Sequence, residues 1–156
     1  NAPLTSHPGG RTAALYDAVV DQFDVARNRR YARRDGNTYC NIFAWDVTRA
    51  MGAEVPHWVR GSELDANDSH RWLANSGPAN GWRRVSAEEA QDLANAGRPA
   101  LATWYNPGGT GHIAVVRPGA LTARGPTTAQ AGARNFNHGQ LQDGFGQRPA
   151  VFWAHA

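Results

Sequence analysis

Cys40 is the only cysteine of the chain, and its surroundings are those of a candidate nucleophile. Apolar residues at Phe43, Val47 and Met51 recur at the spacing of one helix face. We therefore expect a buried helix that carries Cys40 in its first turn and ends at Gly52. Free backbone amides and the positive end of the helix dipole favour a thiolate there. The alternative is that Cys40 is simply a small apolar residue of the core.

A cysteine nucleophile needs a base, and His112 is the leading candidate. It follows a glycine-rich turn and begins an apolar strand, which places it at the edge of a sheet rather than in the core. His138 is its best rival, whereas His57 lies in an apolar stretch where a structural role is expected. The histidines lack i, i+4 or His-x-His spacing, so we expect no metal site and no cofactor.

The base in turn needs a polar residue that orients its ring. Asn135 and Asn137 alternate with Phe136, so on a strand both amides point to the face opposite the phenylalanine. Either side-chain oxygen is a candidate acceptor for the ring N–H of His112.

The elements that must position these residues divide the chain into a helical half and a strand half. Helices are expected over 12–26, from Cys40, over 62–74 and after Ser86, which opens a capping box with Glu89. Strands are expected over 81–85, 99–105, 112–117, 131–137 and 150–155, with a hairpin turn at 106–111 and a long loop at 118–128. Helices followed by an antiparallel sheet define an α+β fold.

Length and composition predict one domain, residues 12–156, preceded by a flexible arm at 1–11. No apolar run approaches the ~20 residues of a membrane span. All 16 basic residues are arginine and the net charge is +3, which suits an anionic partner such as a cell wall. The basic stretch 27–34 contains one aromatic residue, Tyr31, too few for a nucleic-acid interface, so none is expected. A lone cysteine excludes an internal disulfide framework.

The order of these motifs resembles the papain-like peptidoglycan hydrolases, closest to the cysteine, histidine-dependent amidohydrolase/peptidase (CHAP) type, with the NlpC/P60 type as a relative. Cys40 matches the cysteine that opens the first core helix, and Gly111-His112-Ile-Ala-Val-Val116 matches the strand that carries the base. Asn135-Phe136 resembles the asparagine-aromatic pair of the following strand, although the family's carboxylate is replaced by Ala133. The resemblance covers about residues 37–139 and implies a papain-like fold, with helices packed on a C-terminal antiparallel sheet.

The resemblance implies a catalytic set of Cys40, His112 and Asn135 that cleaves an amide of bacterial peptidoglycan through a thioester. The oxyanion would be held by the Cys40 backbone N–H and a donor near Tyr39 or Asn37. The bond would be the muramoyl–L-alanine amide or one within the stem peptide.

Four tryptophans are candidates for the wall of the substrate cleft, with Trp82 or Trp104 the ones expected to be exposed. The four are Trp58, Trp72, Trp82 and Trp104.

The protein is then expected to be a monomer secreted or delivered to the cell wall or periplasm, as a phage lysin, a remodelling enzyme or an antimicrobial toxin. The alternative is a non-catalytic wall- or glycan-binding module on the same fold.

Overall fold

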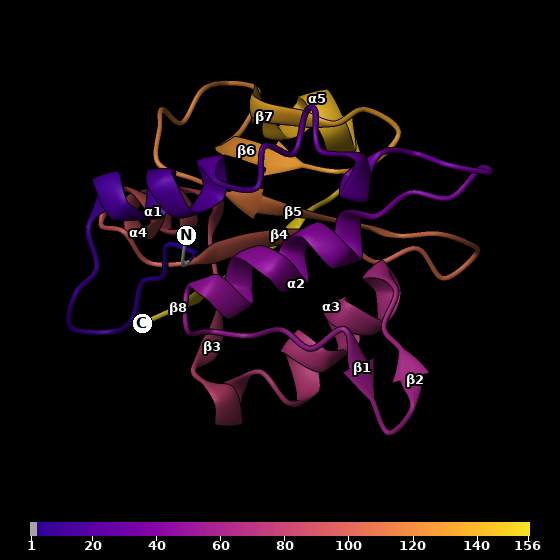
Figure 1. Cartoon of the computed structure of the whole chain (residues 1–156), viewed down its shortest axis with the longest axis horizontal. Helices are drawn as coiled ribbons and strands as arrows, with labels where there is room; N and C mark the ends of the chain where they lie inside the picture. The colour runs from indigo at the N-terminus through magenta and orange to yellow at the C-terminus, as the bar shows by residue number, and fades with distance from the viewer. Residues whose placement is uncertain (1–2) are drawn as a thin grey trace.

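The computed structural model describes residues 3–156 as an α+β fold with five α-helices and a six-stranded antiparallel sheet, in the order β3-β8-β4-β5-β6-β7 (Figure 1). The helices are α1 (Ala13–Asp21), α2 (Cys40–Ala50), α3 (Ala66–Asn75), α4 (Ala87–Asn95) and α5 (Leu141–Phe145). The strands are β3 (Trp82–Val85), β4 (Ala100–Trp104), β5 (His112–Val116), β6 (Thr127–Gln130), β7 (Phe136–Gln140) and β8 (Val151–His155). A separate hairpin joins β1 (Trp58–Val59) to β2 (Ser62–Glu63), and two 3-10 turns are η1 (Arg29–Tyr31) and η2 (Pro78–Asn80).

Local sequence accounts for most of these boundaries. The Ser86 hydroxyl accepts the Glu89 N–H at 3.1 Å while the Glu89 carboxylate accepts the Ser86 N–H, which confirms the expected capping box of α4. The expected hairpin is also present, with Trp104 opposite His112 across β4 and β5. The helix expected over 62–74 begins later, at Ala66, because Asp65 caps it and the preceding residues pair as β2.

Helix α2 packs against β5 and lies in front of the middle of the sheet (Figure 1). Its Phe43, Ala44 and Val47 are almost fully buried. β5 is buried along Ile113–Val116, so the helix packs on an apolar strand in the interior of the sheet. This packing holds Cys40, the first residue of α2, against the strand that begins with His112.

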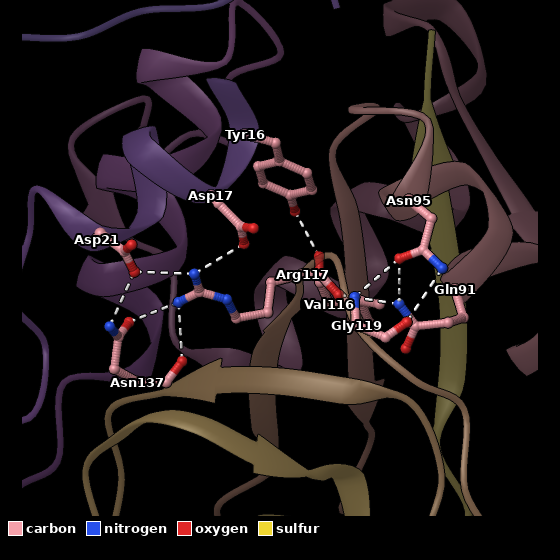
Figure 2. Close-up of polar contacts among 9 residues, drawn as sticks. All are labelled: Tyr16, Asp17, Asp21, Gln91, Asn95, Val116, Arg117, Gly119 and Asn137. Atoms are coloured by element: carbon pink, nitrogen blue, oxygen red, sulfur yellow. Dashed lines mark hydrogen bonds and ion pairs between the residues drawn. The ribbon is translucent and has the colours of Figure 1, made fainter. Parts of the chain in front are cut away.

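A buried guanidinium fastens α1 to the far end of β5 (Figure 2). Arg117 is fully buried and donates to Asp17 and Asp21 at 2.8 Å each. It also donates to the side-chain oxygen of Asn137 at 2.7 Å, while the Tyr16 hydroxyl donates to the Val116 carbonyl. The acidic face of α1 is therefore used to neutralise a buried cation.

Two parts of the chain differ from expectation. The single strand expected over 131–137 is a turn followed by β7, and β6 begins inside the segment expected to be a loop. The arm expected to be flexible is held in its described part, residues 3–11: Leu4 exchanges two hydrogen bonds with the Gln22 side chain, and the Ser6 N–H donates to Ala50.

Candidate active site

Cys40 begins α2, as the sequence predicts, but its thiol is not the preformed thiolate that helix-end electrostatics alone favour. The side chain is 5% exposed, and burial raises its pKa to about 11. The backbone N–H groups of Ile113, Asn41 and Cys40 itself face the sulfur and oppose that shift only in part. In the resting site the sulfur is therefore a protonated thiol, already surrounded by donors that would stabilise a negative charge.

The residue that orients His112 is Gln130, at the end of β6. His112 Nε2 lies 2.7 Å from the Gln130 side-chain oxygen, and the Gln130 amide nitrogen donates to the Arg134 carbonyl at 2.9 Å. Because the second bond requires N–H on the amide, the oxygen must face the imidazole, so Nε2 carries the proton. In the neutral ring Nδ1 is then the free basic atom, and no hydrogen bond reaches it within residues 3–156.

Helix α5 closes over this pair and was not expected from the sequence. The Phe145 ring lies 4.8 Å from the His112 ring, centroid to centroid. A Cβ on Gly144 would lie 1.8 Å from the Gln130 oxygen, so only glycine permits this approach. Burial lowers the pKa of His112 and the hydrogen bond that Nε2–H donates to Gln130 offsets this only in part, so the ring is neutral near pH 7.

The interpretation of Asn135 as the orienting residue needs correction. Asn135 lies in the turn before β7, where its oxygen accepts the Gly132 N–H at 2.8 Å and its nitrogen donates to the Tyr31 carbonyl at 2.7 Å. It fastens the turn to η1. The other candidate, Asn137, lies beside Arg117 and Asp21 in the network of Figure 2 and is likewise engaged away from His112.

Cys40 and His112 line adjoining hollows that share Thr38. The hollow on the His112 side has a volume of about 270 Å³ and includes Gln130 and Trp104. The hollow on the Cys40 side has a volume of about 320 Å³. Among the described residues no hydrogen bond joins the Cys40 sulfur to the His112 ring, so the candidate nucleophile and base lie in neighbouring hollows and are not in direct contact.

Both candidate oxyanion residues, but only one of the two candidate tryptophans, line the hollows of the site. Asn37 and Tyr39 both line the hollow of Cys40, and the Tyr39 ring lies beneath the Arg34 guanidinium. Trp104 lines the His112 hollow. Trp82 is 1% exposed and donates its indole N–H to a backbone carbonyl, so the expectation that it is a surface residue is wrong.

The remaining histidines do not assemble a second centre. His138 is exposed on β7, an edge strand of the sheet. His57 is buried, with Nε2 2.9 Å from Glu63 and its ring stacked on Trp45. Within residues 3–156 no group of three or more histidine, cysteine, aspartate or glutamate side chains is placed to hold a metal ion.

Comparison with known proteins adds no family assignment. The chain matches no protein-family model, and no curated protein matches it either. Among the described residues, none of the helices is both long and apolar enough to cross a membrane.

Proposed function

We propose that the protein is a papain-like cysteine hydrolase that cleaves an amide bond of bacterial peptidoglycan. The observation that carries this proposal is the His112–Gln130 hydrogen bond, which leaves the imidazole a free basic Nδ1 on the first residue of β5, the strand against which the helix of Cys40 packs. The motif order of CHAP and NlpC/P60 hydrolases supports the choice of substrate, and the basic charge of the chain suits an anionic wall.

Acyl transfer begins with proton transfer from the thiol of Cys40 to Nδ1 of His112. The sulfur attacks the amide carbonyl carbon, and the oxyanion that forms is held by the Cys40 backbone N–H and by a donor near Tyr39 or Asn37, which line the same hollow. The carbon–nitrogen bond then breaks, and the leaving amine takes the proton from His112. A thioester of Cys40 remains.

Water completes the cycle with His112 as base again. Nδ1 takes a proton from the attacking water, the sulfur–carbon bond breaks, and a carboxylic acid is released as the thiol regains its proton. Gln130 keeps the ring in one tautomer and one orientation through both halves. Because the free site holds a neutral thiol and a neutral imidazole, the proton moves when substrate binds rather than before.

A second candidate function is a wall- or glycan-binding module without turnover. The observation that favours it is the burial of Cys40 together with the raised pKa of its thiol, which are also the properties of an inert core cysteine.

Digestion of purified cell walls by the wild type and by Cys40→Ala separates the two functions. The hydrolase proposal expects loss of turbidity and new amino termini, identified by mass spectrometry of the released fragments, with the wild type alone. Circular dichroism of Cys40→Ala checks that the variant is folded. Sedimentation of both proteins with the walls, without any released fragment, would support the binding module and refute the hydrolase.

A further inference from the structure

The two hollows beside the candidate pair carry opposite charges. Arg134 and Arg148 line the hollow of His112, and the Arg148 guanidinium lies over the Trp104 ring, 4.8 Å from its centroid. Glu63 and Asp65 line the hollow of Cys40. A substrate that spans the site is therefore met by positive charge at one end and negative charge at the other.

The positive charge of the His112 hollow is available to a ligand. Asp143 also lines it, but its carboxylate is paired with Arg124 at 2.5 Å. Within residues 3–156 neither Arg134 nor Arg148 forms an ion pair, and both are exposed. The aromatic face beneath Arg148 limits the motion of its guanidinium, whose fork of N–H donors matches a carboxylate.

Proton transfer determines which part of the substrate enters this hollow. The carbonyl carbon bonds to the sulfur of Cys40, so the acyl part stays on the Cys40 side. The leaving nitrogen must take its proton from His112, so the leaving part extends into the hollow that His112 lines.

We propose that the Arg134–Arg148 hollow is the leaving-group subsite and selects an amine whose own α-carbon bears a free carboxylate; this inference rests on the proposed hydrolase function. In a peptidoglycan stem, D-glutamate linked through its γ-carboxyl is such a group, because its nitrogen is acylated by L-alanine while its α-carboxylate stays free. The leaving L-alanine of the muramoyl bond lacks that charge, since its carboxyl forms the next amide. Of the muramoyl amide and the amide before D-glutamate, the subsite therefore favours the one before D-glutamate.

Soluble muropeptides in two matched forms, with D-isoglutamate or with D-isoglutamine at this position, test the subsite. We expect kcat/KM of the wild type to favour the carboxylate form about tenfold, because a hydrogen-bonded ion pair is lost in the amide. The variant Arg148→Gln should lose most of that preference. The matched control Arg98→Gln removes an exposed arginine at a separate surface hollow beside Pro8 and should keep it. Equal rates on the two forms, or cleavage at the muramoyl bond, would overturn the inference.

Titration of the same two muropeptides into Cys40→Ala separates this inference from the proposed function. Tighter binding of the D-isoglutamate form than of the D-isoglutamine form, with the difference reduced when Arg148→Gln is added, supports the subsite. If the wild type then cleaves no substrate, the hydrolase proposal fails and the subsite stands. Equal binding of the two forms by Cys40→Ala refutes the subsite, whether or not the wild type digests walls.

Discussion

Gln130 is the residue whose replacement tests the geometry of the site most sharply. It is 2% exposed, and in Gln130→Leu the Nε2–H of His112 loses its acceptor and the Arg134 carbonyl loses its donor. A hydrogen-bonding group left without its partner costs about 1–3 kcal/mol. If that cost is added to the activation free energy because the imidazole is no longer held in orientation, kcat falls about 5- to 150-fold, since each ~1.4 kcal/mol is a factor of ten in rate.

The pH profile distinguishes this role from a merely structural one. The hydrogen bond to Gln130 raises the pKa of His112 against the effect of burial, so its removal lowers that pKa further and shifts the acid limb of kcat/KM to lower pH. Gln130→Glu places a carboxylate at Nε2, so it should raise the pKa of His112 and shift the limb to higher pH.

The assay is wall turbidity between pH 4 and 9, with NMR titration of the His112 ring in a Cys40→Ala background as a readout independent of activity. Gln142→Leu on α5 is the matched control, since the side chain of Gln142 forms no hydrogen bond within the described residues. Limbs that do not move in opposite directions for Gln130→Leu and Gln130→Glu would refute the reasoning.

Two further predictions concern stability. Gly144→Ala places a Cβ 1.8 Å from the buried side-chain oxygen of Gln130, so it should lower Tm and remove activity. In the control Gly108→Ala the nearest atom to the new Cβ is 3.8 Å away, so Tm and activity should stay near wild type. Equal Tm values for the two variants would contradict this. In denaturant unfolding, the double variant Asp17→Asn, Asp21→Asn should lose about 3–5 kcal/mol of unfolding free energy, because the fully buried Arg117 is left without an anion. Arg117→Met should lose less, because it leaves two half-exposed carboxylates that water can solvate. A larger loss of unfolding free energy in Arg117→Met than in the double variant would show that the buried cation does not depend on its two carboxylates.

The sequence predicts the elements that carry Cys40 and His112 because their signals are local. The apolar spacing after Cys40 places the start of α2, and the glycine-rich turn before His112 places the hairpin of β4 and β5. The capping box at Ser86 likewise depends on residues three positions apart.

The orienting residue is missed because it depends on strand register. The segment after Pro126 contains two short strands and a turn, and the turn carries the asparagine that the sequence favours. Gln130 reaches His112 because Ala129 pairs with Val115, which places positions 112 and 130 on the same face of neighbouring strands. The sequence does place Gln130 on the strand after the one that carries His112, but nothing in the residue type distinguishes it from other polar residues of that segment. The pKa of Cys40 is missed for a similar reason, since the dipole of a helix is local whereas the burial of its first residue is tertiary.

Nor does the sequence reveal which tryptophan is exposed. Each of the two candidate tryptophans lies at one end of a short strand. Trp82 begins β3 and points into the core toward Ala53, whereas Trp104 ends β4 and lines a hollow.

The central claim is that Cys40 and His112 form one reacting pair, and the pH dependence of Cys40 alkylation by iodoacetamide tests it most directly. Burial, opposed only in part by the neighbouring backbone N–H groups, raises the thiol pKa to about 11, so a thiol with no base to take its proton would react only at alkaline pH. We predict that neutral His112 takes the thiol proton as the sulfur attacks iodoacetamide. The wild type is then alkylated at neutral pH, at a rate that rises as His112 loses its own proton, whereas His112→Ala reacts only as the pH approaches 11. Identical alkylation profiles for the wild type and His112→Ala, or no native-state reaction of Cys40 at neutral pH, would contradict it.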